Sequence, residues 1–152
     1  MGQLRSQPPS RLIIPKIQVN APVESIGLTA AGALGVPVKP RDAAWSSAGP
    51  LPGAPGVAII TGHFGWKEDV PAVFDDLHTL QIGDRIYLEN SIGITTTFVV
   101  RAVRSYGEHD STTGLFISDD GQAHLSLITC DGDWNALEKS YSRRLVVFAD
   151  KE

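Results

Sequence analysis

The stretch Ile94–Tyr106, ITTTFVVRAVRSY, decides the fold class of this chain. β-Branched and aromatic residues dominate it, and these residue types favour extended strands. We therefore predict one long strand here, in a protein built mostly from strands. Successive side chains of a strand point to opposite faces, which predicts one face of Thr95, Thr97, Val99, Arg101 and Val103 and another of Thr96, Phe98, Val100, Ala102 and Arg104.

Shorter runs of strand character occur on both sides of this stretch, separated by turn residues. The chain has 15 Gly and 10 Pro, enough to interrupt nearly every run. Many short strands joined by turns indicate a closed barrel or a sandwich, and a closed barrel exposes no strand edge. The predicted runs are Arg11–Ile14, Ile17–Val19, Pro22–Gly27, Gly56–Thr61, Arg85–Glu89, His124–Thr129 and Arg144–Ala149.

Helical character is scarce. We predict one short helix at Pro71–Leu77, because Asp69 is a suitable cap and proline is tolerated in a first turn. A second short helix is predicted near Thr112–Phe116.

Length and composition narrow the function classes. With 152 residues the chain is the size of one domain, and we expect a flexible tail at 1–10 before a domain at 11–152. The net charge of −4, without a basic stripe, argues against a nucleic-acid partner. The single cysteine excludes an internal disulfide and a thiolate-rich zinc site. No run reaches the ~18 apolar residues of a membrane span, and the polar segment Met1–Ser10 lacks the apolar region of a secretory signal.

Two apolar runs end in residues that carry chemistry. Val57–His63, VAIITGH, delivers His63 to a strand end, and His124–Cys130, HLSLITC, delivers the only cysteine to another. A lone loop histidine usually has no role, and a lone cysteine is often a buried structural residue. Cys130, however, lies where the apolar run meets the polar loop Asp131–Asp133. A thiol becomes a useful nucleophile there only beside a cation or a base.

A third run, Ser142–Ala149 (SRRLVVFA), opens with adjacent arginines. Such arginines are usually solvated, but a guanidinium can also stabilise an oxyanion or bind substrate carbonyl groups. A cysteine, a histidine and an arginine at strand ends are together the components of acyl transfer, in which a thiolate attacks a carbonyl and an imidazole handles the leaving-group proton. The combination indicates a cysteine acyl-transfer enzyme.

At these three positions the chain resembles the sortases, a family of bacterial cysteine transpeptidases. The matching motifs are TGH at Thr61–His63, LITC at Leu127–Cys130 and RLVV at Arg144–Val147, in the family's order and spacing. Arg11–Val23 and Trp45–Gly56 are also similar to family segments, so the resemblance extends over about 11–149. The Gly/Pro-rich loop and the scarcity of helix look most like class F, or the neighbouring classes D and E.

The resemblance implies a closed eight-stranded β-barrel with one or two short helices. It implies that Cys130, His63 and Arg144 are catalytic and that Thr129 lies at the substrate pocket. The family's catalytic arginine directly precedes the apolar strand, which identifies Arg144 and not Arg143 as the catalytic one. It further implies cleavage of a Leu-Pro-x-Thr-Gly-like sorting signal between Thr and Gly, and transfer to an amine such as a peptidoglycan precursor or a pilin lysine. Members act at the extracellular face of the bacterial membrane through an anchor that this sequence lacks. We expect a monomer.

Two loops are expected to set specificity, Gly107–Ala123 before the cysteine strand and Asp131–Ser142 after it. Leu115, Phe116 and Trp134 are candidate apolar walls for a peptide, although ordinary packing explains each equally well. We expect no metal and no cofactor, because the acidic residues have no EF-hand spacing and no cluster has zinc-ligand spacing. His78, His109 and His124 match no family motif and are interpreted as structural or surface residues.

Two other functions use the same sequence features. A cysteine endopeptidase would employ the same residues with water as the acceptor, and the sequence alone does not separate it from a transpeptidase. A non-catalytic β-barrel binding module is the alternative outside enzymes, and retention of all three polar residues argues against it.

Overall fold

The structure, a computed structural model, describes residues 7–28, 30, 35–65, 70–107, 117–135 and 140–152, and it describes only the backbone of 130–135 and 140–143. The described chain forms a closed barrel with the strand order β1-β2-β3-β4-β7-β8-β6-β5, which confirms the predicted fold class. The strands are β1 (Pro9–Ile14), β2 (Val19–Ile26), β3 (Ala43–Ser46), β4 (Gly56–Gly62), β5 (Arg85–Asn90), β6 (Thr95–Gly107), β7 (Ala123–Asn135) and β8 (Ser140–Lys151).

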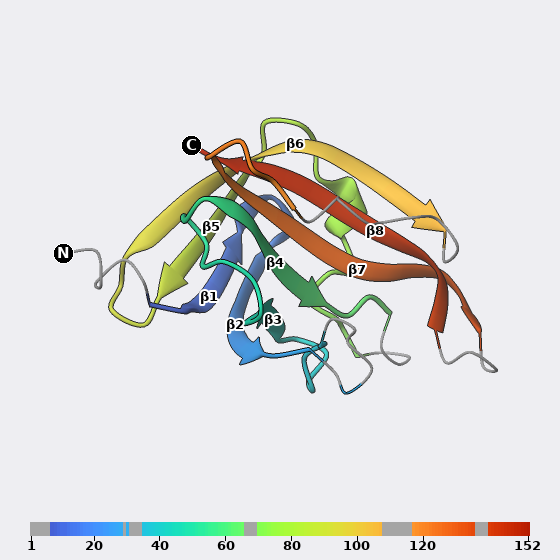
Figure 1. The fold of residues 1–152 in the computed structure, drawn as a ribbon. Coiled ribbons are helices and arrows are strands. Elements are labelled where there is room, and N and C mark those ends of the chain that lie inside the picture. The colour runs from blue at the N-terminus through green and yellow to red at the C-terminus, as the bar shows by residue number, and fades with distance from the viewer. Residues whose placement is uncertain (1–6, 29, 31–34, 66–69, 108–116, 136–139) are drawn as a thin grey trace.

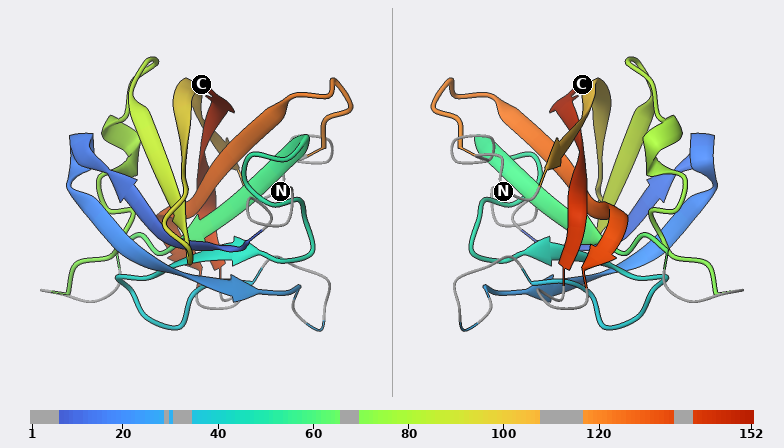
Figure 2. Two further views of the ribbon diagram at one scale, coloured as in Figure 1. Left: turned by 90° about the vertical axis from the view of Figure 1, so that its left-hand side faces the viewer. Right: turned by 90° about the vertical axis from the view of Figure 1, so that its right-hand side faces the viewer.

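Strands β4, β7, β8 and β6 lie side by side in the barrel wall (Figure 1). β7 and β8 are a long antiparallel hairpin, whereas β4 runs parallel to β7. Because the last pair of this ladder is Thr61 with Ile128, the end of β4 lies beside the middle of β7, which continues to Asn135. Figure 2 shows the strands tilting across one another as they wrap around the barrel.

Apolar side chains fill the barrel and also cover part of its wall. The interior core includes Phe74, Phe98 and Leu127, each with 0% of its surface exposed. A second cluster lies on the other face of β4, β7 and β8, and its buried members are Val57, Ile59, Ile128, Val146 and Phe148. Strands β4 and β8 are therefore apolar on both faces, as strands in a covered sheet should be.

Two strand predictions near the N-terminus are corrected. Ile17, predicted to begin a strand, is the last residue of the 3-10 helix η1 (Pro15–Ile17). Val19, the end of that predicted run, belongs with the next predicted run, Pro22–Gly27, to the single strand β2. Gln18 after η1 adopts the left-handed conformation, with φ of 57°. β3 was not predicted, because its four residues are all buried and carry no alternating pattern. β1 begins at Pro9, and the domain boundary at residue 10 stays a prediction.

The long strand keeps its predicted extent within a residue, but its faces change partway. Phe98 and Val100 share a face as predicted, and this face points into the barrel core. A register shift between Val100 and Ala102 then inserts one extra residue, and such a bulge reverses the alternation. Val103 therefore packs on the core, and Ala102 packs on the outer cluster.

The helix predicted at Pro71–Leu77 is a turn that leads into the 3-10 helix η2 (Leu77–Thr79). Asp69 and the helix predicted near Thr112–Phe116 lie outside the described residues. The loop predicted at Asp131–Ser142 is also corrected, because β7 continues to Asn135 and β8 begins at Ser140. The pairing shifts between Asp131 and Trp134, so the Asp-Gly-Asp sequence forms a bulge inside the hairpin and not its turn.

Candidate active site

Backbone pairing brings two of the predicted residues together. Cys130 of β7 is the cross-strand partner of Arg144 of β8, and Arg144 is also paired with Tyr106 of β6. Residues directly opposite each other in an antiparallel pair have Cβ atoms ≈ 4.5–5.5 Å apart. The exposed side chain of Arg144 therefore starts beside position 130. Arg143 is paired with Asp131 and with Gly107, and its side chain is outside the described part of the structure.

His63 reaches the same edge of the sheet from β4. The parallel pairing of β4 with β7 matches Thr61 with Ile128. Two residues further along each strand come His63 and Cys130, so the two positions correspond just beyond the last paired residues. Three segments thus converge where β4 ends. Cys130 and Arg144 lie at this level inside the longer strands β7 and β8, which continue beyond it as a hairpin, so the prediction that Cys130 ends its strand is corrected.

The imidazole of His63 is oriented by a backbone carbonyl. Its Nε2 lies 2.6 Å from the carbonyl oxygen of Pro37. A carbonyl oxygen only accepts hydrogen bonds, so Nε2 must carry the hydrogen, both in the neutral ring and in the cation. In the neutral ring, Nδ1 is then the nitrogen without a hydrogen. The ring is half-buried, which leaves it partly accessible to a reactant.

The segment that supplies this carbonyl is held on β4 by a second bond. The Thr61 hydroxyl donates to the carbonyl oxygen of Gly35 at 2.9 Å. Gly35 lies two residues before Pro37, and Thr61 lies two residues before His63, so the two contacts have the same spacing. Residues 35–37 therefore run along the end of β4. The threonine of the TGH motif fixes the segment that orients its histidine.

Gly62, the middle residue of the motif, is required by close packing. A Cβ atom at this position would lie 2.5 Å from the Phe74 ring and 2.7 Å from Val73. Contacts below 3.0 Å force the surroundings to move, and Phe74 is fully buried in the core. The backbone before His63 is thus pressed against the barrel interior.

Thr129, the residue before Cys130, is buried beside the barrel interior. It is 2% exposed, and its partner on β8 is Leu145, a member of the interior core. Its hydroxyl is buried and makes no hydrogen bond within the described residues. The role of Thr129 at the substrate pocket stays a prediction. Leu115 and Phe116 lie outside the described residues, and Trp134 is described only as a backbone position of β7 paired with Tyr141.

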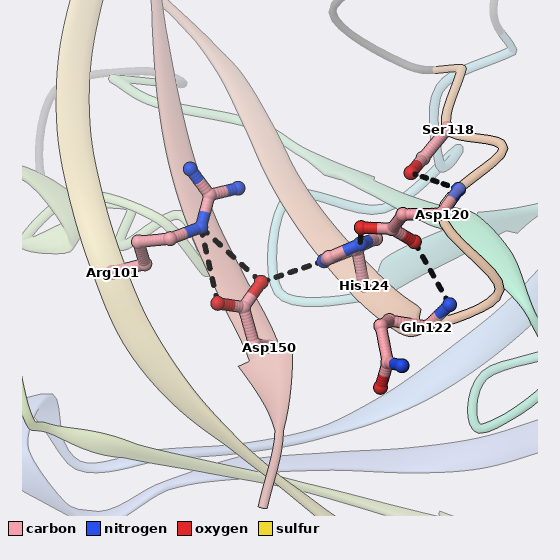
Figure 3. A network of polar contacts seen from close by, with 6 residues as sticks. All are labelled: Arg101, Ser118, Asp120, Gln122, His124 and Asp150. Carbon is pink, nitrogen blue, oxygen red and sulfur yellow. Dashed lines mark hydrogen bonds and ion pairs between the residues drawn. The ribbon is translucent and has the colours of Figure 1, made fainter.

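The other end of the same sheet carries a chain of charged groups (Figure 3). His124 donates from Nδ1 to Asp150 at 2.6 Å and from Nε2 to Asp120 at 2.8 Å. Arg101 donates from Nε to both oxygens of Asp150, at 3.1 and 3.2 Å, and its guanidinium lies 5.6 Å from the centre of the Phe148 ring. These bonds connect β6, β7, β8 and the segment before β7.

The carboxylates determine the charge of His124. The hydrogen bond with Asp150 raises the pKa of His124 above its ordinary value, and Asp120 adds to the effect. The pKa of Asp120 is lowered, first by the amide of Gln122 and then by His124. The network thus favours the protonated form of His124, which agrees with its interpretation as a structural residue.

The remaining candidates carry little chemistry. His78 is exposed in η2, and His109 lies outside the described residues. Within the described ranges, no group of three or more His, Cys, Asp or Glu residues is arranged to hold a metal ion.

Sequence reasoning missed Pro37, the acceptor for His63. No motif marks a residue that acts through its carbonyl oxygen, and its position depends on how residues 35–37 lie on β4. It also missed the partners of His124. The pairing with Asp150 could have been predicted from the hairpin register. Once Cys130 is opposite Arg144, the residue six positions before Cys130, His124, lies opposite the residue six positions after Arg144, Asp150.

Comparison with known proteins gives one family. A family model described as a sortase domain matches residues 12–152. Sortase A from Corynebacterium diphtheriae is similar in structure, with 26% identity and a TM-score of 0.72 over 96% of this chain and 61% of that one. A lid mutant of that protein gives 27% identity and a TM-score of 0.71 over 98% and 73%.

Sortase C-1 from Actinomyces oris shares the fold, with 24% identity and a TM-score of 0.70 over 93% of this chain and 72% of that one. The chain therefore spans between 61% and 73% of these three proteins. No curated protein matches the chain. The neighbours carry class A and class C names, and the class predicted from sequence stays a prediction.

Proposed function

Because the chain belongs to the sortase family and is a sortase-type enzyme, we propose that it is a cysteine transpeptidase with Cys130 as its nucleophile. Its substrate is a sorting signal of the Leu-Pro-x-Thr-Gly type, cleaved between Thr and Gly. The acyl group passes to Cys130 and then to an amine on the cell surface, such as a peptidoglycan precursor or a pilin lysine.

One observation supports this assignment most strongly. The register of β4, β7 and β8 brings the backbones of His63, Cys130 and Arg144 to the same level of the barrel wall, beside the end of β4. These residues come from three separate segments and were selected by their chemistry and motifs. A barrel that does not catalyse acyl transfer would not require these three residues to lie close together.

The first half of the reaction forms a thioester. The Cys130 thiolate attacks the threonine carbonyl carbon, and the carbonyl electrons move onto oxygen. The guanidinium of Arg144 donates hydrogen bonds to this oxyanion or to neighbouring substrate carbonyls. Collapse of the intermediate breaks the carbon–nitrogen bond, and the His63 cation gives its Nδ1 proton to the departing amine.

The second half reverses these roles. His63, now neutral, accepts a proton at Nδ1 from the incoming amine as its nitrogen attacks the thioester. The carbon–sulfur bond then breaks and the thiolate returns. The Pro37 carbonyl holds the same ring edge throughout, because Nε2 remains protonated in both states. Orientation of the ring is thereby kept separate from its proton transfer.

We place the enzyme at the extracellular face of the bacterial membrane, as a monomer, by analogy with the family. The family acts on the cell surface. Among the described helices, none has the length and apolar character needed to cross a bilayer.

The decisive experiment supplies a panel of sorting peptides with and without an amine such as triglycine, and reads the products by mass spectrometry. We expect a ligated product and a peptide adduct that maps to Cys130. Hydrolysed peptide alone, even with excess amine, would instead establish the endopeptidase alternative. Absence of both adduct and cleavage across the panel would contradict the assignment.

A further inference from the structure

The backbone of His63 is fixed by a turn that follows it in the chain. The Phe74 amide donates to the His63 carbonyl oxygen at 3.0 Å, and the Val73 amide donates to the Pro40 carbonyl at 2.8 Å. The Phe74 side chain is fully buried and packs against Gly62. This turn therefore connects the histidine to the barrel core.

A single carboxylate ties the chain on both sides of this connection. Asp75 Oδ1 accepts a hydrogen bond from the Gly65 amide at 2.8 Å, and Asp75 Oδ2 accepts one from the Ala72 amide at 2.9 Å. Gly65 is two residues beyond His63, and Ala72 begins the turn. Both oxygens of Asp75 are thus used, one to hold the segment leaving His63 and one to hold the turn itself.

We propose that Asp75 is a positioning residue for His63, an inference that rests on the proposed function. Its carboxylate sets the turn that fixes the His63 backbone, and the Pro37 carbonyl then fixes the ring. A displacement of about 1 Å in a catalytic group can reduce turnover by about a hundredfold. The two hydrogen bonds of Asp75, which we call the Asp75 clamp, therefore contribute to the rate without contact between Asp75 and the substrate.

The need for a carboxylate is specific. Hydrogen bonds to an ionised acceptor are stronger than neutral ones. Asparagine has one acceptor oxygen, so Asp75→Asn keeps at most one of the two bonds and removes the charge. The adjacent Asp76 provides a matched control, because it is exposed and its side chain does not cap η2.

The test compares Asp75→Asn with Asp76→Asn, each in the unmodified enzyme and in a His63→Ala background. The first measurement is turnover of a sorting peptide with an amine. We expect Asp75→Asn to lower kcat about tenfold with KM changed less than about twofold, since orientation and not binding is impaired. Asp76→Asn should match the unmodified enzyme.

The second measurement is the rate of Cys130 alkylation by iodoacetamide across pH, which needs no sorting peptide. We expect Asp75→Asn to alter this pH profile when His63 is present and to leave it unchanged in His63→Ala, because a residue that acts through His63 has no effect without it. Equal effects in both backgrounds would overturn the proposal, as would an Asp75→Asn enzyme that matches Asp76→Asn. Since alkylation is independent of the sorting signal, a failure of the proposed function stays distinguishable.

Hydrogen exchange in the unmodified protein gives a third measurement that requires no variant to fold. The Gly65 and Ala72 amides should exchange more slowly than unstructured peptide amides, because both are donors to Asp75. Exchange of both at the unprotected rate would show that the clamp is absent in solution, and the proposal would then be abandoned.

Discussion

Two histidines occupy opposite ends of the same sheet, and their partners differ in charge. His63, at the end of β4, is held at Nε2 by the neutral carbonyl of Pro37. His124, near the start of β7, is held at both nitrogens by the carboxylates of Asp150 and Asp120. A carbonyl fixes the direction of a ring without adding a formal charge, whereas two carboxylates stabilise the imidazolium. The partner, more than the residue type, separates a ring that is only oriented from one whose protonated form is stabilised.

The two sites also differ in what they connect. The Pro37 contact orients His63 beside the positions where Cys130 and Arg144 meet. The His124 contacts use the whole ring to join the segment before β7 to β8. If this comparison is correct, the two histidines should respond oppositely to substitution, one in activity and the other in stability.

The largest expected effect is the loss of turnover in His63→Ala. General acid–base catalysis contributes about 10²–10⁴-fold, so we expect a fall of at least about a hundredfold in kcat with a sorting peptide and an amine. His124→Ala and the exposed control His78→Ala should remain within about threefold, because neither lies at the sheet edge that holds Cys130. A loss in His124→Ala as large as that in His63→Ala would remove the distinction between the two ends.

The next effect concerns the arginine opposite the cysteine. Arg144→Lys keeps the charge but loses the planar set of donors, so we expect kcat to fall by about a hundredfold. Arg143→Ala should remain within about threefold, because Arg143 is paired with Asp131 and not with Cys130. Steady-state turnover of one peptide by both variants measures the difference. An inactive Arg143→Ala beside a healthy Arg144→Lys would mean that the functional register is shifted by one residue.

Much of the fold could be predicted because strands with strong residue preferences dominate the chain. β6 has thirteen residues rich in Thr and Val, and its existence was evident. β3 was missed because its four residues AAWS are all buried, so a pattern of alternation never appears. The Asp-Gly-Asp sequence after Cys130 was predicted to be a loop, although the hairpin accommodates it as a bulge. Local turn preference does not reveal which strands continue to pair around a turn-like sequence.

In the candidate site, too, some residues could be predicted from sequence and others could not. His63, Cys130 and Arg144 were selected from sequence because each is a chemically distinctive residue at the end of an apolar run. The groups that hold His63 were not, because Pro37 acts through its backbone and Asp75 acts through amides of residues that carry no signal. Such contacts depend on how loops lie on the barrel. A single sequence contains no periodicity from which that arrangement follows.

The smallest expected effect is the pH dependence of stability contributed by His124. The pKa of His124 is raised in the folded protein, chiefly by Asp150. The network is therefore fully stabilising below the ordinary histidine pKa of about 6.5 and is lost as the pH rises through the higher folded value. The side chain of His124 is 16% exposed, but those of Asp120 and Asp150 are 50% and 40% exposed. Solvent screening should limit the contribution to about 1 kcal/mol or less. Urea unfolding of the unmodified protein and His124→Gln from about pH 6 to about pH 9 measures it. We expect the unmodified protein's advantage to shrink as the pH rises; an advantage that stays constant or grows would show that the carboxylates do not hold His124 as a cation.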